Sequence, residues 1–204
     1  MAQTRVVRRL PRDARRERIL SAARDVFARD GYDRAAMREI AKRAGVTVPV
    51  LYDHFPSKAA LQVHLLVEEG EELLDLISGP FPATEPRGLF EAVGEAFFAY
   101  MEEHRLVWRV LFREAPSDPD VAAVHAELNA RATATIARYF ESLIADEIYG
   151  MKDTAEALAE MAKSAVNGLA AWWWDHPAVP RELVVALASD MLWGGVIGVA
   201  GKRR

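Results

Sequence analysis

Residues 37–58 read MREIAKRAGVTVPVLYDHFPSK, and they predict two short helices joined by a tight turn. Apolar residues recur at helical spacing on both sides of Gly45, which permits the turn. Pro49 falls in the first turn of the second helix, where its missing N–H costs little. Such a pair is either a plain αα-corner or a helix-turn-helix, whose second helix enters the major groove of DNA.

The charge of the chain is unevenly distributed, and this favours DNA binding. Residues 1–60 contain 14 Lys and Arg against 7 Asp and Glu, a net charge of +7, whereas residues 61–204 contain 12 against 23, a net charge of −11. A basic segment on an acidic body is typical of a polyanion-binding domain joined to another domain. The first arginines form either an arm in the minor groove or a solubilising tail: Arg5, Arg8, Arg9 and Arg12.

The rest of the chain also has helical periodicity, so we predict an all-α protein of about nine helices. Residues 1–60 are expected to form the DNA-binding domain, with the helix-turn-helix at about 37–56, and residues 61–204 a second domain. Asp33, Thr47 and Ser57 are predicted N-caps of the second, third and fourth helices. Helices are expected at residues 13–30, 34–44, 48–54, 58–78, 87–103, 105–114, 119–147, 153–174 and 181–200.

The composition argues against several classes of protein. The chain has no cysteine, so it has no disulfide, thiolate metal site or cysteine nucleophile. Its five histidines form no metal-spaced pair, and no nucleophile or phosphate-loop motif is present, so we expect no metal, no cofactor and no enzyme activity. The apolar stretch 183–200 contains Asp190 near its centre, which argues against a membrane span. A cytoplasmic protein without a signal peptide is expected.

Residues 22–61, AARDVFARDGYDRAAMREIAKRAGVTVPVLYDHFPSKAAL, resemble the N-terminal domain of TetR-family transcriptional regulators. The resemblance is carried by Phe27, Gly31, Tyr32, Glu39, Ile40, Ala41, Ala44, Gly45, Val46, Leu51, Tyr52, His54, Phe55 and residues 58–61. It implies a repressor that binds a palindromic double-stranded operator as a homodimer and is released by a small-molecule effector bound in the second domain. It also implies that base edges are faced by Thr47, Val48, Pro49 and Val50, and that phosphates are contacted by Tyr52, His54 and Lys58.

The chain departs from that family's pattern in three places. Family members usually have Thr or Ser before the second helix, where residues 35–36 are alanines, so that phosphate contact is either absent or made by Arg34 or Arg38. Residues 49–50 offer no side-chain donor, so base readout there is expected to be apolar, for example to thymine methyl groups. Asp53 either accepts from a cytosine amino group or points away from the DNA backbone.

The last two predicted helices are expected to form the dimer interface. The three consecutive tryptophans at 172–174 lie at about 100° steps around a helix, so they cannot all face the core of their own chain. A large apolar patch is usually covered by a partner or a ligand. The expected interface residues are Trp172, Trp173, Leu187, Met191, Gly194, Gly195 and Gly198.

An apolar effector pocket is predicted in the middle of the second domain. Ligand sites are mostly apolar with a few placed polar groups, although the same residues could simply fill a core. The effector is expected to be aromatic or fatty-acyl-like, and Gly70 is expected to let the fourth helix bend. Two alternatives are a ligand-independent architectural DNA binder and an enzyme. The candidate pocket residues are Phe90, Phe97, Phe98, Met101, His104, Trp108, Phe112, His125 and Asn129.

Overall fold

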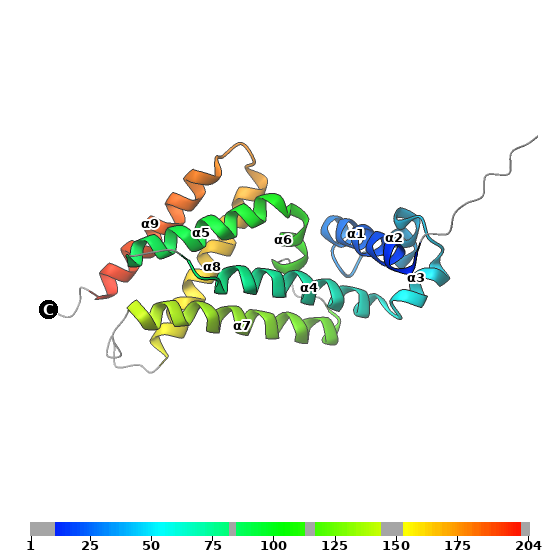
Figure 1. The fold of residues 1–204 in the computed structure, drawn as a ribbon, viewed down its shortest axis with the longest axis horizontal. Helices are drawn as coiled ribbons and strands as arrows, with labels where there is room; N and C mark the ends of the chain where they lie inside the picture. Colours follow the sequence, from blue (N-terminus) through cyan, green and yellow to red (C-terminus); the bar gives the residue numbers. More distant parts are fainter. Residues whose placement is uncertain (1–10, 82–84, 113–116, 144–152, 201–204) are drawn as a thin grey trace, which may run out of the picture.

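The computed structural model describes residues 11–81, 85–112, 117–143 and 153–200, and every regular element in these ranges is a helix (Figure 1). The all-α prediction is therefore confirmed. Within the same ranges, no helix has both the length and the apolar character that a membrane span requires. In chain order the helices are α1 (Arg12–Asp30), α2 (Met37–Ala44), α3 (Val48–His54), α4 (Lys58–Ser78), α5 (Pro86–Glu103), α6 (Arg105–Phe112), α7 (Pro119–Leu143), α8 (Thr154–Asp175) and α9 (Arg181–Ala200).

Helices α1, α2 and α3 form a small N-terminal bundle around a common apolar core. Phe27 of α1, Ile40 of α2 and Leu51 of α3 are almost fully buried in it. Gly45 adopts the left-handed conformation between α2 and α3, with φ of 69°, a conformation that suits a residue without a Cβ. Two helices joined by such a turn are the helix-turn-helix that the sequence predicted.

One predicted helix start is wrong, and one predicted cap makes no bond. α2 begins at Met37, three residues later than expected, with Ala36 at its N-cap, and Asp33 instead accepts a hydrogen bond from Ser117 Oγ at 2.5 Å. α3 begins at Val48 as predicted and Thr47 stands at its N-cap, but the Thr47 side chain makes no capping hydrogen bond. Ser57 caps α4 as predicted, since its Oγ accepts from the backbone N–H three residues later at 2.9 Å.

α4 connects the N-terminal bundle to the rest of the molecule (Figure 1). It packs against α1 of the bundle and against α5, α6 and α7 of the rest of the molecule. The domain boundary expected between residues 60 and 61 falls inside its first turn, so α4 belongs to both parts. At Gly70, the position of the predicted bend, a Cβ would lie 2.7 Å from Leu128 Cδ1. The glycine lets α7 approach α4 closely.

The C-terminal part is a bundle in which α7 packs on α4 and α8, and α5 packs on α9. α6 lies beside α1 (Figure 1), and Arg109 of α6 donates to the Ala28 carbonyl of α1 at 3.2 Å. The Tyr32 hydroxyl, after α1, donates to the Asp118 carboxylate at 3.0 Å. Burial and this bond raise the pKa of Tyr32 to about 12, so the phenol remains a donor. The N-terminal bundle is thus tied to the C-terminal bundle at several points.

Candidate DNA-binding surface, ligand cavity and dimer face

α3 presents one side to the core and the other to solvent. Leu51 is fully buried, whereas 46% of Tyr52 is exposed although it is a large aromatic residue. The other predicted contact residues of this segment also reach the surface: Thr47, Pro49 and Asp53 are exposed, and Val48, Val50 and His54 are partly exposed. The head of α3 can therefore approach DNA without any rearrangement of the core.

Lys58, a predicted phosphate contact, is bonded to the protein's own backbone. Its ammonium group donates to three backbone carbonyls of the turn between α1 and α2, those of Tyr32 at 2.9 Å and of Asp33 and Ala35 at 3.3 Å. The same nitrogen lies 4.4 Å from the centre of the Tyr32 ring. An ammonium has three donors, so this geometry occupies all of them inside the protein. Lys58 therefore holds the turn ahead of α2 and does not extend toward solvent.

Positive charge surrounds the surface of α2 and α3. Arg38 is exposed on α2, and Arg34 is exposed beside it with its Nε donating to the Asp30 carbonyl at 3.0 Å. The pKa of His54 is lowered below 6.5, first by burial and then by nearby positive charges of α1 that disfavour the charged imidazole. These charges are the guanidinium groups of Arg12, Arg15 and Arg16. The N-terminal end of α1 thus adds cationic groups next to the end of α3, where phosphates of bound DNA would be favoured.

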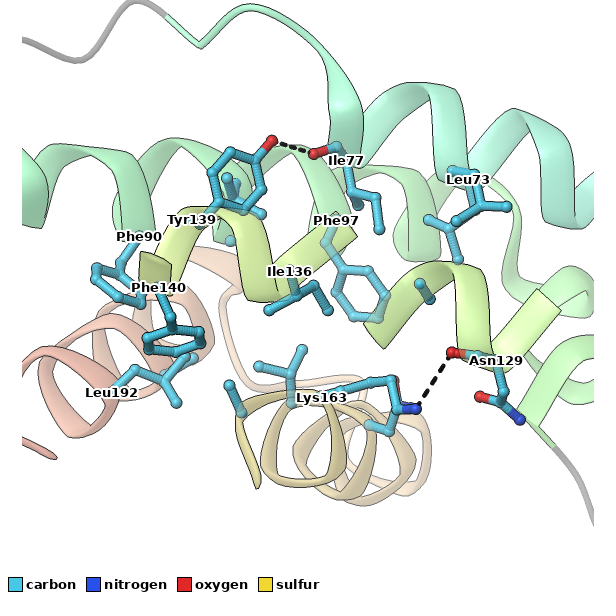
Figure 2. A pocket seen from close by; sticks show the side chains of 18 of the residues that line it. Leu73, Ile77, Phe90, Phe97, Asn129, Ile136, Tyr139, Phe140, Lys163 and Leu192 are labelled. Atoms are coloured by element: carbon cyan, nitrogen blue, oxygen red, sulfur yellow. Dashed lines mark hydrogen bonds between the residues drawn. The ribbon is translucent and has the colours of Figure 1, made fainter. Parts of the chain in front are cut away.

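An apolar cavity of about 150 Å³ lies between α4, α5, α7, α8 and α9 (Figure 2). Four of the predicted pocket residues line it: Phe90, Phe97, His125 and Asn129. The other walls include Leu73, Ile77, Tyr139, Phe140 and Leu192, which Figure 2 shows around the same space. An apolar cavity of about 150 Å³ is large enough to bind a molecule of the size of benzene.

Three predicted pocket residues lie outside this cavity. Phe98 is fully buried and packs edge-on against a tryptophan of α8, because it lies one helical step beyond Phe97 and faces the other way. Met101 lines a separate hollow of about 60 Å³. His104 stacks on a tyrosine of α5, with ring centres 4.4 Å apart. The side chains of Trp108 and Phe112 lie outside the described residues.

Most polar groups at the cavity already have partners in the protein. Lys163 Nζ lies 2.7 Å from the Glu160 carboxylate and donates to Thr133 Oγ1 at 2.7 Å. The hydrogen bond from Lys163 holds the pKa of Glu160 below 4.5. His125 Nε2 lies 2.7 Å from a backbone carbonyl of α6, and its Nδ1 lies 3.3 Å from the Asn129 amide. The cavity therefore offers mainly apolar contact to a ligand.

α8 and α9 carry an exposed apolar face. Met191 is 73% exposed, Leu187 is 52% exposed, and Trp172 also reaches solvent. Three glycines of α9 leave open space beside the helix: at Gly194, Gly195 and Gly198, an added Cβ would meet no described residue of another helix within 4 Å. Trp173, another predicted interface residue, is partly buried, and its indole N–H donates to the Val179 carbonyl at 2.8 Å. Exposed apolar residues on two neighbouring helices make this face a candidate interaction surface.

Comparison with known proteins matches both parts of the chain. A family model described as "Bacterial regulatory proteins, tetR family" matches residues 19–65, and one described as "Tetracyclin repressor-like, C-terminal domain" matches residues 86–195. The HTH-type transcriptional activator FasR of Mycolicibacterium smegmatis is 33% identical over 196 residues, which cover 92% of this chain and 85% of FasR. The chain belongs to the TetR family of transcriptional regulators.

Further comparisons agree with membership of the TetR family. The HTH-type transcriptional repressor KstR of Rhodococcus jostii is 44% identical over 59 residues, which cover 29% of this chain and 28% of KstR. The crystal structure of a TetR-like transcriptional regulator from Rhodococcus sp. RHA1 has a TM-score of 0.76 at 27% identity, and the match covers 93% of this chain and 100% of that chain. TetR-family members are DNA-binding regulators and not enzymes, so the predicted class of function is confirmed.

The sequence reasoning missed polar residues in the ligand cavity of this TetR-family regulator. Lys163 of α8 and Ser189 of α9 line the cavity. A signal for both was present, because each has apolar residues four positions before and three positions after it, at 159 and 166 for Lys163 and at 185 and 192 for Ser189. Residues at this spacing share one face of a helix, so a polar side chain there points toward the interior, where it needs a partner or a ligand.

Proposed function

We propose that this TetR-family regulator represses transcription by binding a palindromic operator as a homodimer, and that an apolar effector in its cavity releases it from DNA. The observation that carries the proposal is the path of α4. Leu61, near the start of this helix, is fully buried with the N-terminal bundle, whereas Leu73 and Ile77, near its end, line the cavity. A change in the cavity that shifts α4 therefore also moves the DNA-binding surface.

The exposed side of α3 supports the DNA-binding part of the proposal. The residues at its head, 47–50, are proposed to face base edges in the major groove, where Pro49 and Val50 would contact thymine methyl groups. Tyr52 and His54 are proposed to contact the phosphate backbone together with Arg38. Lys58 acts indirectly, because its bonds to the turn before α2 hold that helix in place.

The apolar face of α8 and α9 supports the homodimer. One chain has one recognition helix and can read one half-site, whereas a palindrome of two half-sites needs two helices about 34 Å apart. Packing α8 and α9 against the same helices of a second chain would cover Met191 and Leu187, and the glycines of α9 would let the two helices approach closely. Closed two-fold symmetry of this kind is the commonest arrangement of soluble homo-oligomers.

Release by an effector follows if the cavity is larger, or differently shaped, in the form that does not bind DNA. A ligand changes the affinity for DNA only by the ratio of its own affinities for the two forms. Leu111 of α6 also lines the cavity, and Arg109 of the same helix is bonded to α1. α6 thus offers a second connection from the cavity to the N-terminal bundle.

Repression is the simplest consequence of such binding, because a dimer on an operator that overlaps a promoter excludes the polymerase. KstR, which matches the N-terminal part, is named a repressor, whereas FasR, which matches most of the chain, is named an activator. In vitro transcription distinguishes repression from activation, using promoters with the operator placed either inside or upstream of the promoter. A repressor should lower the amount of transcript when the operator lies inside the promoter, whereas an activator should raise it when the operator lies upstream.

The proposal is tested by selecting bound sequences from a pool of random DNA with the purified protein. We expect an inverted repeat, which is then used as a fluorescent operator in anisotropy titrations with and without small aromatic compounds such as naphthalene. Ala132→Leu, which fills part of the cavity wall, should respond less to the compound and bind DNA as before. Salt-dependent binding without sequence preference would instead favour a ligand-independent architectural protein.

A further inference from the structure

We infer that the effector is an uncharged apolar molecule that carries a hydrogen-bond acceptor, such as a ketone, ester or amide, and that Ser189 donates to this acceptor. The inference rests on the proposed function, because it names the class of molecule that the regulatory cavity takes. Two features of the cavity wall carry it: a buried hydroxyl without a partner, and a charged side chain whose charge is already balanced.

The hydroxyl of Ser189 is the first feature. This residue of α9 lines the cavity and is only 2% exposed, and its Oγ has no hydrogen-bond partner among the described residues. A serine inside a helix usually satisfies its hydroxyl by bonding back to the carbonyl four residues earlier, and Ser189 does not. A buried hydroxyl without a partner is unfavourable, so a ligand acceptor within reach of it would gain a full hydrogen bond.

Space beside this hydroxyl is provided by a glycine on the facing helix. Gly94 of α5 also lines the cavity, and a Cβ there would lie 3.6 Å from Ser189 Oγ and 3.7 Å from Val185 Cγ1. With glycine at this position, no side chain of α5 lies over the hydroxyl. Because these distances are ordinary van der Waals contacts, alanine would fit at this position and would cover the hydroxyl without forcing α5 and α9 apart.

The charge at the cavity is the second feature. Among the described residues that line it, Lys163 is the one with a full charge. Its ammonium lies 2.7 Å from the Glu160 carboxylate, donates to Thr133 Oγ1 at 2.7 Å and reaches the Asn129 carbonyl at 3.5 Å, a contact drawn in Figure 2. A ligand carboxylate there would meet an ammonium whose donors are engaged, next to the negative charge of Glu160. An anionic head is therefore disfavoured inside the cavity, and a neutral acceptor is not.

Three compounds with the same chain length separate these properties: hexane, 2-hexanone and hexanoate. In titrations of the full-length protein at pH 7, Ser189→Ala should lower the affinity for 2-hexanone about three- to tenfold, the value of one net hydrogen bond, and should leave the affinity for hexane unchanged. Hexanoate should bind the wild-type protein more weakly than 2-hexanone. The control Ser21→Ala, at an exposed position of α1, should change none of these affinities.

Two further measurements make the outcome independent of the stability of one variant. Gly94→Ala should also lower the affinity for 2-hexanone more than that for hexane, because its methyl group covers the hydroxyl. The carbonyl stretch of bound, ¹³C-labelled 2-hexanone should lie at lower frequency in the wild-type protein than in Ser189→Ala, since a donated hydrogen bond weakens the C=O bond.

Each contrary result has a distinct meaning. An affinity for 2-hexanone that is the same in Ser189→Ala as in the wild-type protein would overturn the role of Ser189, while release of operator DNA by either compound would leave the proposed function standing. Tightest binding by hexanoate, abolished in Lys163→Met, would overturn the requirement for an uncharged ligand. If none of the three compounds bound the protein or changed its affinity for operator DNA, the inference would fail together with the effector role of the cavity.

Discussion

Replacing Lys58 by methionine tests whether the lysine at the start of α4 holds the turn before α2 or binds a DNA phosphate. The substitution keeps a long apolar stem and removes the ammonium that donates to the carbonyls of Tyr32, Asp33 and Ala35. Hydrogen bonds to charged groups contribute about 1.5–3 kcal/mol each, but these carbonyls can regain water at the edge of the turn, so we expect a loss of about 2 kcal/mol in the free energy of unfolding.

This loss should be visible as a fall in Tm. For a chain of this length, 1 kcal/mol corresponds to about 2–4 °C, so Lys58→Met should melt about 4–8 °C below the wild-type protein in calorimetry. The salt dependence of operator binding should remain unchanged, because no phosphate contact is removed. Arg38→Met is the matched control, since its exposed guanidinium on α2 should contribute about 0.9 to the salt slope and little to Tm.

The opposite pattern would refute the assignment of Lys58 to the turn. If Lys58→Met melted at the wild-type temperature and lowered the slope of log K against log salt by about 0.9, the lysine would be a phosphate contact, as the family resemblance implies. Tm and the salt slope come from separate measurements. A partly unfolded variant would melt at a lower temperature, so it cannot imitate this result.

Three further predictions concern other parts of the molecule. Met191→Glu, at the most exposed apolar position of α9, should give monomers in sedimentation velocity experiments at micromolar concentration, and a dimer would place the interface elsewhere. Gly70→Ala should lower the free energy of unfolding, measured in urea, by up to about 2 kcal/mol. Overpacking against Leu128 costs about 1–3 kcal/mol, and the better helix propensity of alanine offsets about 1 kcal/mol of this. A stabilised variant would contradict this prediction. The pKa of His54 is lowered in the folded state by burial and by the arginines of α1, so its stabilising effect is present above pH 6.5 and is lost as pH falls through the lowered pKa. His54→Gln should therefore flatten the dependence of Tm on pH on the acid side of 6.5, and an unchanged profile would contradict the assignment.

The helix-turn-helix could be predicted from the sequence because its determinants are local. Gly45 sets the turn by its own backbone conformation, and Ser57 caps α4 through an N–H three residues away. Lys58 shows the limit of such reasoning, because its partners lie 23–26 residues earlier and only the folded bundle brings them together. The predicted cap at Asp33 is wrong for the same reason, since nothing in its neighbourhood indicates Ser117, 84 residues away.

The ligand cavity was predictable as a region and not residue by residue. An aromatic-rich stretch indicates buried surface, but Phe97 lines the cavity and Phe98 fills the core, because one helical step turns the side chain by about 100°. Neighbouring tryptophans of α8 differ in the same way: Trp172 is exposed to solvent, whereas Trp173 is partly buried and its indole N–H donates to a loop carbonyl. Assigning such neighbours requires knowledge of which helix packs on which side, and that depends on contacts across the whole chain.

The continuity of α4 constrains how parts of this protein could be exchanged with those of relatives. Its 21 residues span about 30 Å, and every added residue rotates the downstream chain by about 100° and moves it by about 1.5 Å. In a chimera that joins the N-terminal bundle of one family member to the effector domain of another, one extra residue in this helix would rotate both recognition helices of a dimer away from their half-sites. An insertion of seven residues, close to two full turns, would nearly restore the rotation but would lengthen the spacing between half-sites. A sensor built from such parts must therefore conserve the residue count of α4 before any attention is given to its side chains.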